Sequence, residues 1–185
     1  MSIKKLLLFL YLSLVGCASF TTAIYSPDYE AVDSLKGGKL KKISVANVQP
    51  SSPDSPVNSI TLRGGSLVVK DGTFSSYIQN ALISDLKEAG VFDENSAVRI
   101  NLTVVKNEID VSSMNNGSGN IEIHMNISQN NRVYFEKTYT VATTFESAYA
   151  AAVAIPRGQN EYPNLIRHLF RKIYSDPDFI KAVKK

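Results

Sequence analysis

Three successive segments in the second half of the chain alternate apolar and polar residues, and this alternation limits the folds open to the sequence. The segments are 97–106, 120–128 and 132–145. Successive side chains of a β-strand point to opposite faces of a sheet, so the alternation gathers the apolar residues on one face. Long alternation is typical of antiparallel strands with the other face in water. The chain therefore predicts a sheet with a second layer over its apolar face.

Two local signals set the register of these strands. Asn130-Asn131 predicts a tight hairpin turn between the second and third strands, because asparagine tolerates a positive φ. In the first strand, Val104 and Val105 interrupt the alternation, and the apolar residues then continue on the other parity. A β-bulge near Val105 accounts for this change of face.

Two segments with apolar residues at helical spacing supply the second layer. The first can be capped by Asp71 or Thr73 and ends at Gly90, a glycine suited to a helix C-cap. The second runs from Tyr162 to Asp176-Pro177, where proline favours the start of a last helical turn. Extended segments are expected at 40–48 and 59–69. The predicted fold is α+β with two layers: a mostly antiparallel sheet of about four strands, and two amphipathic helices on one face.

A loop is expected at 154–163, because Pro156 and Gly158 are residues that end helices. This loop contains Arg157 and Tyr162, and both residue types are enriched at protein interfaces. The two are therefore candidates for a partner-binding surface. An ordinary loop that connects two helices accounts for the segment equally well.

The polar face of the predicted sheet is a second candidate surface. His124 and Tyr134 lie on the polar parity of their strands and are expected on this face. If the helices cover the apolar face, the polar face stays open. It is then suited either to a protein partner or to plain solvent.

The N-terminus has the three parts of a secretory signal in the required order. Lys4 and Lys5 supply a positive start, residues 6–15 form an apolar run, and Gly16 and Cys17 follow. A run of about ten residues spans about half of a hydrocarbon core of about 30 Å, so it is too short for a permanent span. Cys17 is the only cysteine, so no disulfide can form within the chain.

The tetrapeptide Leu14-Val15-Gly16-Cys17 resembles the bacterial lipobox. The resemblance implies that lipid is transferred to the Cys17 thiol and that the chain is cleaved between Gly16 and Cys17. Three acyl chains would then hold the mature protein at a membrane. In lipoproteins of enteric-type bacteria an Asp after the cysteine marks retention in the inner membrane. Ala18 stands there instead, which implies the outer membrane, facing the periplasm. The alternative is an ordinary cleavable signal.

The expected organisation has three parts. Residues 1–16 are the lipoprotein signal peptide, 17–40 are a lipidated N-terminus with a flexible tether, and 41–185 are a single periplasmic domain. The tether is expected to be flexible because it is rich in Ser, Thr, Pro and Gly without a sustained apolar period. Tyr25 and Tyr29 are the residues within it that could dock back on the domain, in which case part of the tether is ordered.

The charge balance excludes one class of partner. The chain has 20 Lys+Arg and 17 Asp+Glu, and loss of Lys4 and Lys5 with the signal leaves a net charge of +1. A nearly neutral domain has no electrostatic footprint for nucleic acid. Lys181, Lys184 and Lys185 form a small basic cluster, which is expected to be a solvated helix end.

The residues required for catalysis are scarce. The chain has two histidines, His124 and His168, and neither has a neighbour at the spacing of a zinc site, so no metal or other cofactor is expected. The sequence lacks the G-x-S-x-G, P-loop and G-x-G-x-x-G motifs. Glu108 and Asp110 would share a strand face, an arrangement that a hydrolase could use, but a solvated strand end is the favoured interpretation. No catalytic residue is predicted.

The lipobox and the order strand, helix, three strands, helix resemble small outer-membrane assembly lipoproteins. Segment 61–91, which contains SYIQNALISDLKEAGV, is similar in layout to the lipopolysaccharide-assembly lipoprotein LptE. Segment 165–178, a helix followed by Asp-Pro-Asp, is similar to the YajG-like group of lipoproteins. The resemblance covers about residues 40–183 in layout and carries over one functional residue, Cys17.

An anchor, a compact domain and the lack of a catalytic motif together predict a non-enzymatic lipoprotein that binds or supports another cell-envelope protein. The alternative is a small-molecule or lipid-binding module with a pocket between the sheet and the helices. A hydrolase that uses Glu108 and Asp110 is the third hypothesis.

Overall fold

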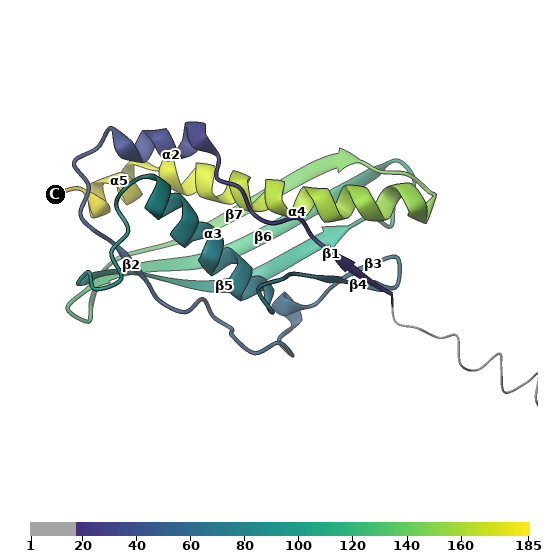
Figure 1. Cartoon of the computed structure of the whole chain (residues 1–185), viewed down its shortest axis with the longest axis horizontal. Helices are drawn as coiled ribbons and strands as arrows, with labels where there is room; N and C mark the ends of the chain where they lie inside the picture. The colour runs from purple at the N-terminus through teal and green to yellow at the C-terminus, as the bar shows by residue number, and fades with distance from the viewer. Residues whose placement is uncertain (1–17) are drawn as a thin grey trace, which may run out of the picture.

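The computed structural model describes residues 18–185, so the predicted cleavage and lipidation at Gly16 and Cys17 lie outside the described residues (Figure 1). The helices are α2 (Tyr29–Lys36), α3 (Phe74–Glu88), α4 (Ala151–Tyr174) and α5 (Pro177–Val183), with a 3₁₀ turn, η2, at Pro56–Asn58. The strands are β1 (Ser19–Thr21), β2 (Ser44–Val45), β3 (Ile60–Leu62), β4 (Gly65–Val68), β5 (Val98–Asp110), β6 (Asn116–Gln129) and β7 (Arg132–Glu146).

The main sheet has the order β2-β5-β6-β7, with β5, β6 and β7 antiparallel and β2 parallel to β5. The alternating residues of β5 and β6 are buried on one face, as predicted. The hairpin turn lies at Asn130-Asn131, where φ is 51° and 64°. The register of β5 against β6 shifts between Val104 and Lys106, which confirms the predicted bulge.

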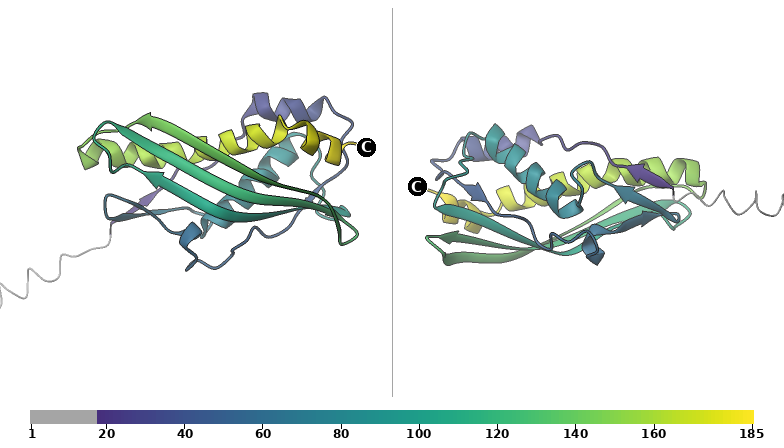
Figure 2. Two further views of the ribbon diagram at one scale, coloured as in Figure 1. Left: turned by 180° about the vertical axis from the view of Figure 1, so that it is seen from behind. Right: turned by 60° about the horizontal axis from the view of Figure 1, so that its bottom comes forward.

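The helices form a second layer on one side of this sheet (Figure 2). Helix α4 packs across β5, β6 and β7, and α2 and α3 pack beside it. Thr73 caps α3 through its side chain, and Asp176 caps α5 ahead of Pro177. The α+β class is therefore confirmed. The structure adds a second sheet, of order β1-β4-β3, in which β1 is parallel to β4.

The helix break predicted at Pro156 and Gly158 is wrong, because α4 runs without interruption from Ala151 to Tyr174. Its apolar stripe is buried against the sheet, with Leu165, Leu169 and Ile173 each 0% exposed. The free energy gained by this burial outweighs the low helix propensity of two prolines and a glycine. Gly158 also has a packing role. A Cβ there would meet the side chain of Val111 at 3.0 Å, so glycine lets α4 lie this close to the sheet without displacing its neighbours.

The second proline of α4 is compensated by a residue far away in the sequence. Pro163 has no N–H, so the carbonyl of Gln159, four residues earlier, lacks its helical donor. The Thr22 hydroxyl donates to that carbonyl at 2.7 Å, and the Gln159 side-chain amide donates to the carbonyl of Thr21 at 2.8 Å. Thr22 is buried. The segment just after the predicted anchor thus supplies a hydrogen bond that the helix cannot make for itself.

Replacement of Thr22 by valine tests this compensation. Thr22→Val keeps the shape of the side chain but leaves the partly buried carbonyl of Gln159 without a donor, which costs about 1–3 kcal/mol. We expect the free energy of unfolding in urea to fall by this amount. Thr21→Val, at an exposed neighbouring position, should change it by less than about 0.5 kcal/mol. Equal stability of the two variants would contradict the role assigned to Thr22.

The segment 17–40 was predicted to be a flexible tether, but residues 19–36 of it form a strand, a packed segment and a helix. Residues 19–28, here called the strap, form β1 and then run along α4, and residues 29–36 form α2. Arg167 donates to the carbonyl of Ser26 at 2.9 Å, and Arg171 donates to the carboxylate of Asp28 at 2.9 Å. The prediction failed because the strap has little apolar pattern of its own. Its order comes from the pairing of β1 with β4 and from polar groups on α3 and α4.

Tyr25 attaches the strap to a buried carboxylate on α3. Its hydroxyl donates to Asp85 at 2.9 Å, and the hydroxyl of Tyr174 donates to the same carboxylate at 3.0 Å. Asp85 is 1% exposed. Burial raises the pKa of Asp85 to about 6, although the two tyrosine hydrogen bonds act to lower it. The predicted docking of Tyr25 is thus observed, whereas Tyr29 is 60% exposed.

The raised pKa of Asp85 predicts a pH-dependent stability. Folding raises this pKa from 3.8 to about 6, so the folded chain keeps a proton that the unfolded chain releases between these values. The resulting stabilisation is complete below pH 3.8 and is lost as the pH rises through 6. From pH 4 to pH 7, the free energy of unfolding of the parent should therefore fall by about 2 kcal/mol relative to that of Asp85→Asn.

Asparagine is the matched control, because it does not titrate and can still accept hydrogen bonds from both tyrosines. Carboxyls whose pKa is lowered, such as Asp110 and Asp176, contribute equally to the pH dependence of both proteins. Their contributions therefore cancel when the free energies of unfolding of parent and variant are subtracted. A difference that stays constant from pH 4 to pH 7 in urea titrations would contradict the raised pKa.

Candidate functional site

The candidate site is the outer face of the sheet of β5, β6 and β7, which the helical layer does not cover (Figure 2). Because the buried residues of β6 alternate with partly exposed ones, every second side chain reaches this face. The register aligns Thr103 with His124 and Thr138, and Asn101 with Asn126 and Glu136. The face is therefore made of rows of polar residues.

The outward side chains of this face bind one another. The Nε2 of His124 lies 2.9 Å from a carboxylate oxygen of Glu136, and its Nδ1 lies 3.3 Å from the hydroxyl of Thr138. Asn101 donates to the Asn126 side chain at 2.8 Å. His124, predicted on the polar face, is thus placed there. These contacts hold the side chains in defined positions, which lowers the entropy lost when a partner docks.

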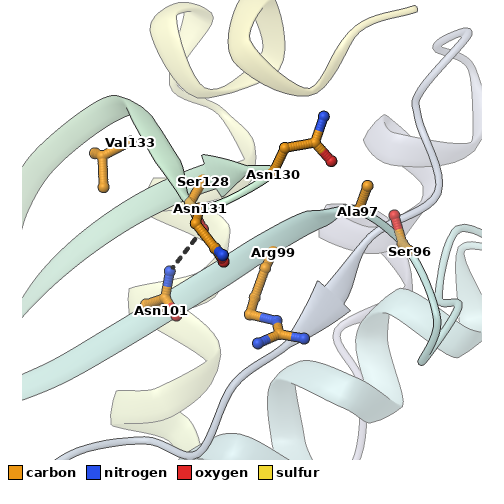
Figure 3. Close-up of a pocket in the computed structure, with 8 residues that line it drawn as sticks. All are labelled: Ser96, Ala97, Arg99, Asn101, Ser128, Asn130, Asn131 and Val133. Atoms are coloured by element: carbon orange, nitrogen blue, oxygen red, sulfur yellow. Dashed lines mark hydrogen bonds between the residues drawn. The ribbon is translucent and has the colours of Figure 1, made fainter.

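A cavity of about 310 Å³ lies at the hairpin end of this face (Figure 3). It is lined by Ser96, Ala97, Arg99, Asn101, Ser128, Asn130, Asn131 and Val133. Arg99 is the only charged residue among them. Sequence reasoning missed this cavity, because its residues come from three strands, the hairpin turn and the segment that precedes β5. The signal that could have found it is the register of β5 against β6, which sets Arg99 opposite Ser128, next to the expected hairpin turn.

Tyr134 was predicted to lie on the same face as His124, and the structure does not bring the two together. The register of β6 against β7 shifts here, so that Ile127 pairs with Phe135 but Ser128 pairs with Val133. Tyr134 lies in this bulge. Its hydroxyl donates to the carbonyl of Ala182, a residue of α5, at 3.4 Å. A bulge re-aims side chains, and the sequence pattern here did not reveal it.

Arg157 and Tyr162 do not form an exposed loop, because both lie in α4. Tyr162 is fully buried, with its ring centroid 4.8 Å from that of Phe74, and its hydroxyl accepts a hydrogen bond from Asn107 at 3.1 Å. Arg157 donates to the carbonyl of Ser147 at 3.2 Å. The partner surface predicted from these two residues is therefore wrong, since the helix continues through Pro156 and turns Tyr162 into the core.

Glu108 and Asp110 are engaged in separate local contacts. Lys106 lies 3.1 Å from Glu108, and the backbone N–H of Ser112 donates to Asp110 at 2.7 Å. The hydrogen bonding from Ser112 lowers the pKa of Asp110, so this carboxyl is unsuited to act as a general acid near neutral pH. Within residues 18–185, no three His, Cys, Asp or Glu side chains lie close enough together to hold a metal ion.

Two alanine variants separate a core residue from a face residue. Tyr162→Ala removes a buried aromatic ring and should cost about 3–5 kcal/mol of stability. His124→Ala acts at a solvated face and should cost less than about 0.5 kcal/mol. Thermal unfolding followed by circular dichroism measures both. A large loss for His124→Ala would mean that the polar face serves the fold and is not free for a partner.

Comparison with known proteins gives a structural similarity only. No protein-family profile and no curated protein matches the sequence. The fold is similar to that of a Xanthomonas campestris protein described as DUF330, with a TM-score of 0.61 and 13% identity over 89% of this chain and 97% of that one. A minor lipoprotein from Acinetobacter baumannii gives a TM-score of 0.47 and 15% identity over 79% and 96%.

At these identities the similarity shows the fold alone. The resemblance to LptE and to the YajG-like group stays a prediction. Among the helices of residues 18–185, none is both long and apolar enough to cross a membrane.

Proposed function

We propose that this chain is a bacterial lipoprotein, anchored through lipid on Cys17 to the outer membrane, whose folded domain docks another envelope protein and has no catalytic activity of its own. The observation that carries the docking role is the uncovered polar face of β5, β6 and β7. The lipobox at Leu14–Cys17 supports the anchor.

The size of the open face suits a protein partner. Strands of 13 to 15 residues extend about 45 Å, and three strands about 4.8 Å apart give a face of roughly 600 Å². A standard interface buries about 800 Å² per partner, so this face and its rim suffice. The strands that form it are backed by buried side chains, which suits a preformed docking surface.

The position of the strap complements the anchor. One residue, Ala18, separates Cys17 from β1, and β1 is hydrogen-bonded in the small sheet. A lipid on Cys17 would therefore hold the folded domain directly at the membrane surface, with little freedom to stand away from it. A docked partner would be held there too, which suits an assembly role.

The anchor is tested with the full-length chain beside a Cys17→Ser variant in a Gram-negative host fed a labelled fatty acid. We expect the parent to incorporate the label and to fractionate with the outer membrane. Cys17→Ser should incorporate none. Equal labelling and fractionation of both proteins would refute the anchor and favour an ordinary cleavable signal.

The docking face is tested by a photo-crosslinking amino acid placed at Thr103, in the row that aligns it with His124 and Thr138 on the open face. We expect a discrete crosslinked protein, which is lost or weakened in the Cys17→Ser background because the domain no longer concentrates at the membrane. The matched control places the same group at Ser34, an exposed position on α2 in the other layer. Equal capture from Thr103 and Ser34, or no capture from Thr103 in an anchored protein, would contradict the proposal.

The alternative, a ligand pocket between the sheet and the helices, stays a prediction without support from the geometry. Side chains such as Ile123, Met125 and Phe170, exposed by at most 1%, occupy the space between the two layers.

A further inference from the structure

Two lysine clusters that lie about 140 residues apart in the sequence meet at one end of the molecule. The N–H of Lys41 donates to the carbonyl of Val183 at 2.8 Å, and the N–H of Lys185 donates to the carbonyl of Lys39 at 2.8 Å. Leu40 and Lys184 form the antiparallel bridge between the two segments. This pairing gathers six lysines, here called the basic end: Lys39, Lys41, Lys42, Lys181, Lys184 and Lys185.

The charges of the basic end are not neutralised within the described fold. Five of the six lysines are exposed, Lys41 is partly exposed, and none of them forms an ion pair within residues 18–185. The nearby carboxylate of Asp178 is bound by a different residue, Lys137, at 3.1 Å. Without the signal and these six lysines, the chain has 12 basic against 17 acidic side chains. Positive charge is therefore concentrated at this end.

An aromatic residue accompanies the lysines. A groove of about 410 Å³ is lined by Lys41, Tyr134, Phe135, Asp178, Lys181 and Ala182. Tyr134 is 42% exposed, and the ammonium of Lys41 lies 5.4 Å from the centroid of its ring. Tyrosine is enriched at the boundary between lipid headgroups and water, where lysine side chains also act as anchors.

We propose that the basic end binds the anionic headgroups of a phospholipid bilayer and forms a second membrane contact of this protein. Clusters of four to eight basic residues close to a membrane bind anionic lipid, and each Lys strengthens binding about fivefold. Lysine is a point charge on a flexible stem and suits a fluid array of phosphates. Protein interfaces are depleted in Lys and enriched in Arg, and the basic end has six lysines and no arginine.

The position of the basic end determines what this contact would do. The C-terminus and β1 lie near opposite ends of the long axis of the molecule (Figure 1). Thr22 lies beside Gln159 on α4, and the basic end lies past the end of this helix at Tyr174, about 22 Å further along it, which exceeds the Debye length of about 8 Å. If Cys17 is lipidated, as proposed above, an upright domain would hold the basic end beyond the reach of the surface. Headgroup binding would instead lay the long axis along the membrane.

The test uses the mature chain with Cys17→Ser, so that binding does not depend on the lipid anchor. Cosedimentation is measured with vesicles of phosphatidylcholine alone and with phosphatidylglycerol added. We expect binding to the mixed vesicles only, and binding should weaken as salt is raised. Lys39→Gln, Lys184→Gln and Lys185→Gln together should weaken it roughly a hundredfold.

The matched control removes three exposed basic residues elsewhere, as Arg63→Gln, Lys70→Gln and Lys106→Gln. It lowers the net charge equally and should retain most of the binding. Circular dichroism checks that both triple variants are folded. Equal losses in the two triple variants, equal binding to both kinds of vesicle, or no binding by the parent would each overturn the proposal. Because the test lacks the anchor, its failure leaves the lipidation of Cys17 standing.

A second measurement locates the contact in the lipidated full-length chain. A photo-crosslinking amino acid at Tyr134 should capture phospholipid, whereas the same group at Val105, on the outer sheet face, should not. Capture of an acidic protein in place of lipid at Tyr134 would assign the basic end to a protein partner and refute the bilayer contact.

Discussion

The structure depends on the burial of one apolar face, shared by β5, β6 and β7, beneath a single long helix. Helix α4 crosses all three strands, and the residues of its stripe are almost completely buried. Each fully buried Leu, Ile or Phe stabilises the fold by about 1.5–3 kcal/mol, far more than one missing helical hydrogen bond costs. The helix therefore continues through Pro156 and Pro163, and the sheet keeps its other face free.

The same helix explains why the segment after the predicted anchor is ordered. Pro163 leaves the carbonyl of Gln159 free, and Thr22 donates to it, while Arg167 and Arg171 bind the strap further along. Tyr25 then links the strap to Asp85 on α3. These contacts are polar and specific, and they join the first described residues to the core. A pull on the N-terminus would thus be carried into the core through defined hydrogen bonds.

The surfaces proposed for function lie on parts of the molecule that this core leaves free. The open face of β5, β6 and β7 is turned away from the helices, and the basic end lies where the segment at Lys39–Lys42 meets the C-terminus. An anchor near β1, a lipid contact at the other end and a polar face between them would orient a docked partner along the membrane. The three features are separate in structure, so variants can test each of them alone.

Local pattern in the sequence was sufficient for β5, β6 and β7, the hairpin at Asn130-Asn131, the bulge near Val105 and the class of the fold, because side-chain alternation and positive φ act over a few residues. It could not determine the course of α4, since proline and glycine signal a break unless long-range burial outweighs them. Nor could it place Tyr162 in the core or turn Tyr134 toward α5. The strap and the basic end were decided by tertiary structure alone, because each depends on hydrogen bonds between segments more than 130 residues apart.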